Sequence, residues 1–542
     1  MKRKFLSRFM AASLATVMTI GLAGCGGGDD SGSSGGQESS KGSEQTEQSS
    51  PDGSSAGQDS EVSQEPEGDV DPYPVITDKD GNVPDLGGME IIIRDWFSGD
   101  GNRSEANNSY TEALYEYQDW AQEKYNFTLK QMSISGWGDV PADYQNYVTG
   151  GGDENNYIFI LRTGGELLQA MKNDMMYDLG TLDCLDFSQA KWQESNVHLQ
   201  YTDVVTGKIN AMRPVYAEPR GGMYFNKRVL QEAGINPDDI YQWQESGEWT
   251  WEKFVECCEK VTRDTDSDGV LDIHALTGQD TVFYGEAVAS NNADYVALEN
   301  GKYVNKLESN ETMQAMNWAV DVWKKHNTPY PEGAEWNYFS TIWQEGKAAF
   351  FAGQAYAAGQ DFGPNYVKNE ETGQNEWDGT YKVPDELGFV CFPKGPAASD
   401  YTNIYDDNVY VIPACYDADK AWKLAFALNV WTEPLPGYED YSAFREDQRN
   451  NFRDSESVDL TLARMMENGR LTYHGMVNGL DIGGDLYWKL NENNSLAQQV
   501  EAIRDKWNYY IALANGEDAE KPQSLIDEEK AAEEAAAAEG TE

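Results

Sequence analysis

Residues 207–236 read GKINAMRPVYAEPRGGMYFNKRVLQEAGIN, and this stretch decides the fold. Its centre, GGMYFNK (221–227), is a short apolar run that is typical of a buried strand. A polar segment, EPRGG (218–222), leads into that run. The same pattern recurs along the chain, at MEIIIRDWF (89–97), NYIFILRT (156–163), KAAFFAG (347–353), LGFVCFPKG (387–395) and NVYVIPA (408–414).

Helical patterns lie between these runs. Apolar residues recur at three- and four-residue spacing in 109–126, 249–264, 311–327 and 417–431. Beyond Pro434 the pattern is helical only, and it ends in SLAQQVEAIRDKWNYYIALANG (495–516). Strands that alternate with helices of this length predict an α/β fold with largely parallel sheets and a helical C-terminal region.

Further motifs follow residues 207–236 in order along the chain: WTWEKF (249–254), IWQEGKAAFF (342–351), LGFVCFPKGP (387–396) and VYVIPACYDADKAWKLAFAL (409–428). Together these landmarks resemble the bacterial extracellular solute-binding proteins, and within them the carbohydrate-binding branch that includes maltose-binding protein. In that family the stretch 207–236 carries the chain from one lobe to the other, through a strand like KINAMRP, a strand like YFNK and a helix that ends in Ala-Gly.

The resemblance implies a two-lobed, periplasmic-binding-protein-like fold with strand crossings at a hinge. By analogy lobe 1 comprises 87–214 and 396–432, and lobe 2 comprises 215–395 and 433–516. It also implies a function without catalysis: capture of a carbohydrate, expected to be an oligosaccharide, between the lobes, and delivery to the permease subunits of an ABC transporter. A monomer is expected.

Length and charge agree with this picture. The roughly 430 residues from about Gly87 to Gly516 are too many for one ordinary core, so two lobes are expected. A formal net charge of −52 argues against nucleic acid and anionic lipid surfaces as partners. Apart from Cys25, five cysteines remain, and an odd number with an adjacent pair is unlike a disulfide framework. They are interpreted as mostly buried thiols.

The N-terminal residues have the pattern of a secretory signal. A positively charged head, MKRKFLSRF, precedes a short apolar segment that ends at about Leu22. Leu-Ala-Gly-Cys (22–25) resembles the bacterial lipoprotein signal, in which the cysteine carries the lipid, such as palmitate; the alternative is a plain signal peptide with a chance cysteine. We therefore predict a signal peptide over 1–24, a lipidated Cys25 and an extracytoplasmic protein anchored to the cell membrane. Two or more acyl chains anchor stably.

The two ends of the chain have compositions that do not support a core. Residues 25–86 are rich in Gly, Ser, Glu and Asp and predict a flexible acidic linker. Residues 517–542 are acidic and alanine-rich, and we predict a disordered tail there that forms a helix only transiently.

Candidate ligand-binding residues follow the predicted strands, because ligands of open α/β sheets bind beyond the carboxyl ends of strands. In lobe 1 Asp95 would accept sugar hydroxyls and Trp96 would cover a ring face, although Trp96 alone also suits packing under the next loop. Arg162 and Thr163 end a second strand and precede Gly-Gly, which is also a plain turn. Glu218 and Arg220, at the first crossing, would contact the ligand or pair with each other.

In lobe 2 the family resemblance aligns Tyr356 with an aromatic residue, usually Trp, that stacks on the sugar. Asp361 would accept a hydroxyl beside it, and Trp336 would form a second platform. Asp407 precedes the last crossing strand and would face the ligand. Trp488 would either close lobe 2 over the ligand or be buried, and burial is the expectation.

The segment DTDSDGVLD (264–272) matches the start of an EF-hand-type calcium loop. It predicts a structural Ca²⁺ held by Asp264, Asp266, Asp268, the Val270 carbonyl and Asp272. Ala275 stands where the bidentate Glu is usual, so an Asp-capped turn is the alternative. No catalytic cofactor is expected.

Two other functions remain open. A surface glycoside-processing enzyme would need paired carboxylates, which a chain with 93 acidic residues offers everywhere. A lipoprotein that presents its ligand to a membrane sensor would look the same in sequence as one that serves an importer.

Overall fold

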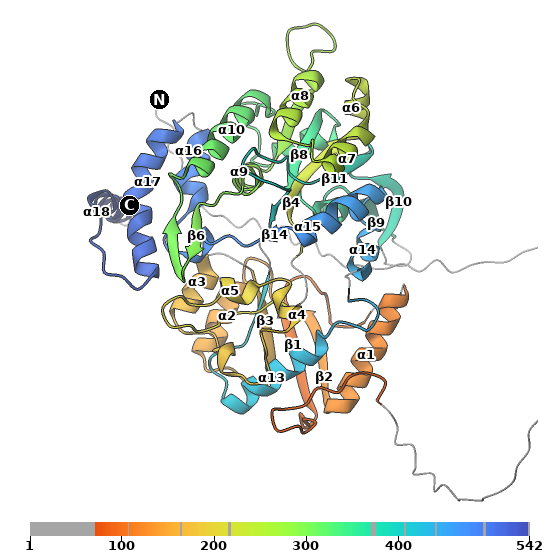
Figure 1. Cartoon of the computed structure of the whole chain (residues 1–542), viewed down its shortest axis with the longest axis vertical. Coiled ribbons are helices and arrows are strands. Elements are labelled where there is room, and N and C mark those ends of the chain that lie inside the picture. Colours follow the sequence, from red (N-terminus) through yellow and green to blue (C-terminus); the bar gives the residue numbers. More distant parts are fainter. Residues whose placement is uncertain are drawn as a thin grey trace, which may run out of the picture.

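The computed structural model describes residues 71–539, except for 104, 107, 163–164, 215–217, 370–374, 406–407, 440–441 and 492–494. Cys25, the signal segment, Thr163 and Asp407 therefore lie outside the described residues. Figure 1 shows two lobes, one above the other, with α13 and the orange N-terminal elements in the lower one. This is the two-lobed α/β architecture that the sequence predicts.

Lobe 1 is built around a four-stranded sheet in the order β13-β3-β1-β2. The pairs β1–β2 and β1–β3 are parallel, and β13 runs antiparallel to β3. The lobe contains β1 (Met89–Asp95), α1 (Ser109–Tyr125), β2 (Phe127–Ser133), α2 (Val140–Thr149), β3 (Asn156–Leu161), α3 (Gly165–Lys172), η1 (Leu179–Thr181), α4 (Ala190–Gln193), α5 (Val197–Gln200), β13 (Val409–Val411) and α13 (Ala418–Trp431).

Lobe 2 is built around a second sheet in the order β11-β4-β8-β5. Its elements before the last crossing are β4 (Gly221–Asn226), α6 (Lys227–Glu232), α7 (Pro237–Ser246), α8 (Trp251–Val261), β5 (His274–Gly278), α9 (Asp280–Ala289), β6 (Val296–Glu299), β7 (Lys302–Asn305), α10 (Asn310–His326), α11 (Tyr338–Gln344), β8 (Ala348–Gln354), α12 (Ala357–Gln360), β9 (Pro364–Lys368), β10 (Asn375–Tyr381), β11 (Leu387–Val390) and β12 (Asn403–Ile404).

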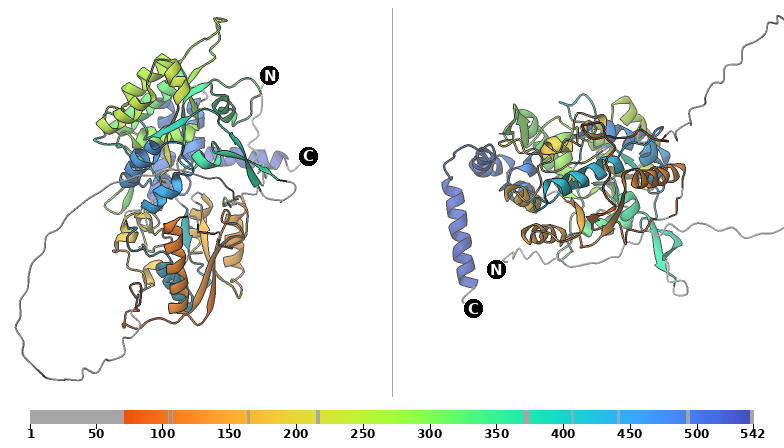
Figure 2. Two further views of the ribbon diagram at one scale, coloured as in Figure 1. Left: turned by 90° about the vertical axis from the view of Figure 1, so that its right-hand side faces the viewer. Right: turned by 90° about the horizontal axis from the view of Figure 1, so that it is seen from below.

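The C-terminal part of the chain returns to lobe 2 and is mostly helical, as the sequence predicts. Figure 2 shows these blue elements packed on and beside the upper lobe. They are α14 (Ser442–Gln448), η2 (Ser457–Leu462), α15 (Ala463–Glu467), β14 (Gly469–Arg470), η3 (His474–Met476), η4 (Gly483–Tyr487), α16 (Trp488–Asn491), α17 (Leu496–Ala514) and α18 (Gln523–Glu539).

The helices begin where the sequence supplies a capping side chain. Asn108, Thr250 and Asp417 each accept a hydrogen bond from a backbone N–H in the first turn of α1, α8 and α13. Asn126 ends α1 in the left-handed conformation that Asn tolerates. Local chemistry therefore sets these boundaries.

The expectation of largely parallel sheets is wrong for lobe 2. Strands β5 and β8 are parallel, but β4 runs antiparallel to both of its neighbours, β8 and β11. The reason is the direction of entry. Strand β4 starts directly after the crossing from lobe 1, at Gly221, and runs away from the lobe boundary, while β8 ends beside it at Gln354.

The domain limits differ from the predicted ones at three places. The fold begins before residue 87, because Asp71 pairs with Lys124 at 2.7 Å and Leu86 is buried. Residues 396–404 lie with lobe 2, where Tyr401 donates to the Trp243 carbonyl and β12 pairs with β14. Within the predicted disordered tail, Gln523–Glu539 form α18, and Leu525 is buried.

Candidate functional site at the lobe boundary

The two main sheets meet the lobe boundary at defined edges. In lobe 1, β13 starts just after the chain has crossed over, and Val409 pairs with Leu161, so the carboxyl end of β3 lies at the boundary. In lobe 2, β4 starts just after the first crossing, and Gly221 pairs with Gln354, the last residue of β8. Residues that follow β3, β5 and β8 are therefore the candidates for ligand contact.

Five side chains gather at this edge of lobe 2, and we call them the lobe 2 cluster: Glu218, Arg220, Gln279, Tyr356 and Asp361. The Ala355 N–H donates to the Arg220 carbonyl at 2.8 Å, which fixes the crossing segment against the loop after β8. Gln279 follows the end of β5, the parallel neighbour of β8. Strand pairing thus assembles residues that are far apart in the sequence.

The groups around Tyr356 shift the pKa of its hydroxyl. Burial raises this pKa most, the charge of Asp361 raises it further, and Arg220 and a hydrogen bond from Gln279 lower it. Partial desolvation raises the pKa of the Asp361 carboxyl, against the opposing charge of Lys382. The cluster therefore offers an aromatic ring with carboxylate, amide and guanidinium groups around it.

Glu218 and Arg220 pair with each other at 3.2 Å, which is the alternative that the sequence left open. The pair does not remove them from the site, since both side chains stay partly accessible beside Tyr356. A guanidinium retains further donors after one ion pair.

Asp95 does not act as the sequence predicts. Its side chain is 1% exposed and accepts hydrogen bonds from the Phe97 and Ser98 backbone and from the Ser98 hydroxyl, at 2.9 to 3.1 Å. Its second oxygen accepts from Gln131 on β2 at 2.5 Å. Both carboxylate oxygens therefore accept hydrogen bonds from the loop after β1 or from the neighbouring strand. The prediction that Asp95 contacts the ligand is wrong, and its role is to stabilise that loop.

Trp96 packs against the protein interior, which is the alternative to ligand contact that the sequence left open. Its ring is partly buried against the hydrophobic cores and meets Phe97 edge-on at 5.4 Å.

The aromatic surface at this edge of lobe 1 comes instead from Trp137, which the sequence analysis missed. Trp137 lies in the loop after β2 and is 61% exposed. The Arg162 guanidinium stacks over its ring at 4.3 Å. Strand β2, FTLKQMS, alternates with polar residues and is not one of the predicted apolar runs, so the rule that places ligand contacts after apolar strands does not include the loop that follows it.

Two further indoles are exposed, and residues next to each of them interact with Asp280 at the start of α9. Trp336 is 78% exposed, and its carbonyl accepts a hydrogen bond from Tyr330, a residue whose pKa responds to Asp280. Trp488 is 51% exposed, so its predicted burial is wrong. It belongs to α16, where Asn491 donates to Asp280 at 2.7 Å.

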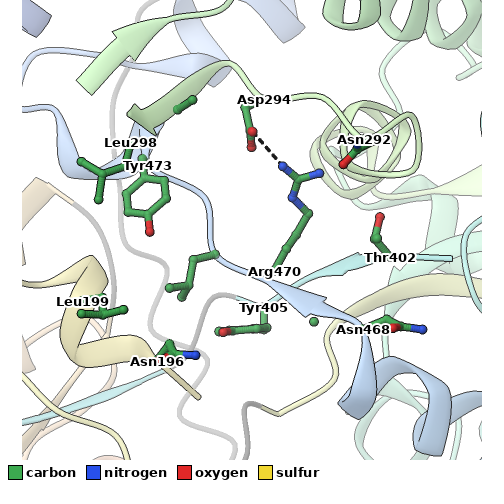
Figure 3. Close-up of a pocket in the computed structure, with 13 residues that line it drawn as sticks. Asn196, Leu199, Asn292, Asp294, Leu298, Thr402, Tyr405, Asn468, Arg470 and Tyr473 are labelled. Carbon is green, nitrogen blue, oxygen red and sulfur yellow. Dashed lines mark hydrogen bonds and ion pairs between the residues drawn. The ribbon is translucent and has the colours of Figure 1, made fainter. Parts of the chain in front are cut away.

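A cavity of about 580 Å³ lies beside the hinge and contains none of the predicted site residues. Figure 3 shows that Arg470 and Asp294 meet within it, at 2.7 Å, with Tyr405 and Tyr473 nearby. Asn196 and Leu199 of lobe 1 close one side. The cavity borders β12 and β14 and not the carboxyl ends of the main strands, so it is separate from the lobe 2 cluster.

The acidic loop before β5 brings three carboxylates together. Oxygens of Asp264, Asp266 and Asp268 lie within 4.8 Å of one another. The Gly269 N–H donates to Asp264 at 2.8 Å, and Gly269 has a φ of +90°. Asp272 is not one of these three carboxylates and accepts from the Thr265 N–H at 2.7 Å.

The remaining cysteines are thiols. Among the described residues Cys257, Cys258 and Cys391 are buried and unpaired, while Cys184 and Cys415 are partly buried and also free. Burial raises the pKa of the Cys184 thiol to about 12, so it stays protonated and unreactive near neutral pH.

Comparison with known proteins identifies the family of the chain. The model of the family of bacterial extracellular solute-binding proteins matches residues 107–428, well over half of the chain. The chain belongs to that family. As a member of this extracellular family, the solute-binding protein works outside the cytoplasm. Within the part of the chain that the structure describes, no helix combines the length and apolar character needed to cross a membrane.

Solved structures share the fold of this solute-binding protein. A cyclic alpha-maltosyl-1,6-maltose binding protein from Arthrobacter globiformis is 13% identical, with a TM-score of 0.54, and the match covers 78% of this chain and 99% of that one. A sugar transporter structure from Rhizobium etli, in an open conformation, is 14% identical, with a TM-score of 0.50 and coverage of 78% and 99%. At these identities the likeness concerns the fold. No curated protein matches the chain.

Proposed function

We propose that this solute-binding protein captures a carbohydrate, specifically an oligosaccharide, between its lobes and delivers it to an ABC importer. The observation that carries the proposal is the lobe 2 cluster, in which Tyr356 lies among Glu218, Arg220, Gln279 and Asp361. Sugar hydroxyls both donate and accept hydrogen bonds, and pyranose rings have flat apolar faces. Carboxylate, amide and guanidinium groups around one aromatic ring suit that chemistry.

The two solved structures with the same fold support this choice, since one is described as binding a cyclic maltosyl-maltose and the other as a sugar transporter. Lobe 1 would add Trp137, with Arg162 stacked on it, as a second ring surface. The protein would then act by closing its lobes, because a ligand that contacts both lobes favours the state in which they approach each other.

We infer binding without turnover. Glu218 is held in an ion pair with Arg220, and the family is one of solute-binding proteins. A chromogenic glycoside assay separates this proposal from a surface enzyme, because turnover above that of a Glu218→Gln variant would contradict it.

Isothermal titration calorimetry tests the ligand class. A panel of maltose, linear α-1,4- and β-1,4-glucans, xylo-oligosaccharides and short peptides should give heat with at least one sugar and none with peptides. Tyr356→Ala should weaken sugar binding at least about tenfold, the loss of roughly 1.4 kcal/mol. Tyr509→Ala, on α17, is the matched control. Heat with peptides alone, or an unchanged Kd in Tyr356→Ala, would contradict the proposal.

We also propose that the loop at 264–272 binds a structural Ca²⁺ through Asp264, Asp266, Asp268 and the Val270 carbonyl, with Asp272 completing the shell after it leaves Thr265. The proximity of the three carboxylates supports this, since oxygen ligands at alternate positions suit a hard cation. Ca²⁺ should raise the Tm of the wild type and not that of Asp266→Asn. Glu252→Gln, an exposed carboxylate on α8, is the control, and an equal rise in Asp266→Asn would contradict the site.

The proposals for membrane anchoring and partners rest on the N-terminal sequence and on the family. We propose that Cys25 carries the lipid, that the protein is a monomer, and that permease subunits receive the ligand. Cells that express Cys25→Ser should release the protein from the membrane fraction. Retention of that variant would contradict a lipid anchor.

A further inference from the structure

The hairpin formed by β9 and β10 projects from lobe 2. Figure 1 places both strands at the right of the upper lobe, just above the lobe boundary, and Figure 2 shows the hairpin extending away from the body. It starts at Pro364, three residues after Asp361 of the lobe 2 cluster. The hairpin is therefore a direct continuation of the loop that holds the candidate site.

One face of this hairpin is aromatic. Trp377 pairs directly across the ladder with Tyr366, so the two side chains share a face. Their exposed fractions are 52% and 57%. The ring of Tyr381 extends the same surface toward the body of the lobe, 5.8 Å from the ring of Trp377.

The opposite face is polar. Asn365 donates to the Thr380 hydroxyl at 2.9 Å, and Asn369 donates to Glu376 at 2.7 Å. Val367 is the aliphatic residue of that face, opposite Glu376. The two faces of the hairpin therefore differ, and the exposed aromatic rings lie on one face only.

The aromatic face is held in place at its base. The Arg453 guanidinium stacks on the Tyr381 ring at 3.9 Å, and it donates to the carbonyls of Phe362, Val383 and Asp385 at 2.6 to 2.8 Å. Lys382 donates from its side chain to the Gln360 carbonyl. An isolated two-stranded hairpin is marginal in water, so these contacts with the lobe are what keep the rings presented.

The indole N–H of Trp377 is already used, since it donates to the Thr380 carbonyl at 2.8 Å. What Trp377 offers to a partner is therefore its ring face and not a hydrogen bond. Flat ring faces on a rigid, otherwise polar strand pair suit the apolar face of a pyranose. A protein partner would more commonly meet several aliphatic side chains, whereas beside its rings this face carries Lys368 and, at its base, Pro364.

We propose that the aromatic face of the β9–β10 hairpin, Tyr366 and Trp377, is an outer subsite for the far end of the same oligosaccharide whose near end occupies the lobe 2 cluster. The inference rests on the proposed function and makes it more specific. The ligand is a linear chain long enough to extend out of the lobe boundary, and units beyond those held between the lobes stack on the hairpin.

Calorimetry with a graded series tests the subsite, using the linear α-1,4-glucans of two to seven units or the linear series that binds in the panel above. For the wild type, affinity should rise with length beyond the shortest ligand that binds. In Tyr366→Ala/Trp377→Ala that gain should fall about tenfold, while the shortest ligand keeps its Kd. Val367→Ala, on the other face, should behave like wild type.

Hydrogen exchange gives a second measurement that does not rely on a variant. Long ligands should protect residues 364–368 and 375–381, and the shortest binding ligand should not. The subsite is overturned if length dependence is the same in the double variant. It is also overturned if that variant binds every sugar normally but fails to stimulate the transporter, since the face would then dock the permease. If no sugar binds the wild type, the proposed function fails, and the subsite fails with it.

Discussion

The edge of lobe 1 and the edge of lobe 2 meet the same boundary with different chemistry. In lobe 2, charged and polar groups surround Tyr356 and remain partly accessible. In lobe 1, the Asp95 carboxylate accepts hydrogen bonds from its own loop and from Gln131. The accessible group there is the Trp137 ring, over which the Arg162 guanidinium stacks. Under the proposed function, lobe 2 would supply polar recognition and lobe 1 would supply an apolar cover.

The largest expected effect concerns how tightly the edge of lobe 2 is packed. A Cβ on Gly278 would lie 2.4 Å from the Ala352 carbonyl oxygen, at a φ of +123°. Gly278→Ala should lower the free energy of unfolding by about 3 kcal/mol or more, because backbone must move. Gly333→Ala, at a φ of +84° with open space around it, should cost only about 1 kcal/mol. Equal losses in urea melts of the two variants would show that the edge relaxes.

The second prediction tests whether Asp95 stabilises its loop or binds the sugar. Asp95→Asn places an amide where a carboxylate oxygen accepts from Gln131, so two donors would face each other. Stability should fall by about 2 kcal/mol. Affinity for the sugar identified by calorimetry should stay within about twofold of wild type. A large loss of affinity at unchanged Tm would show instead that Asp95 contacts the ligand.

A third prediction concerns pH and the support beneath lobe 2. Glu286 is 2% exposed, and it accepts from the Ile404 N–H at 3.1 Å. Burial raises its pKa well above the usual value, against hydrogen bonding from Ile404 and the charge of Arg470. The folded state therefore keeps a proton that the unfolded chain releases above a pH of about 4.3.

Stability should accordingly fall as pH rises above that value, by up to about 1.4 kcal/mol per pH unit while only the folded state holds the proton. Glu286→Gln should flatten this slope in thermal melts between pH 4 and pH 8. The exposed Glu252→Gln variant should keep the wild-type slope. A slope that survives in Glu286→Gln would assign it to another group.

The smallest expected effect tests the apolar cover of lobe 1. Trp137→Ala removes an exposed ring and its contact with Arg162, so stability should hardly change. Sugar affinity should fall by roughly threefold to tenfold, about 1 kcal/mol, which is less than for Tyr356→Ala. Trp137→Phe should recover part of the loss. An unchanged Kd in Trp137→Ala would leave lobe 2 as the sole source of recognition.

Several features of the fold could be read from local sequence. The predicted helices at 109–126, 311–327 and 417–431 match α1, α10 and α13 within a residue at each end, because capping side chains and apolar spacing act within a few residues. The buried runs before residues 162 and 356 are strands. Strands β2 and β5 were not predicted, since FTLKQMS and HALTG are not continuous apolar runs.

By itself, then, the sequence determined the alternation of elements, the family landmarks and the approximate place of Tyr356, because each depends on neighbours in the chain. Only the tertiary structure decided how the groups at the boundary are used. Asp95 is satisfied by Gln131 from an adjacent strand, Arg220 meets Tyr356 because β4 pairs with β8, and Trp137 is exposed where the sequence showed only a loop. Whether a polar group faces a ligand depends on partners that strand pairing brings from far along the chain, and a local pattern does not contain them.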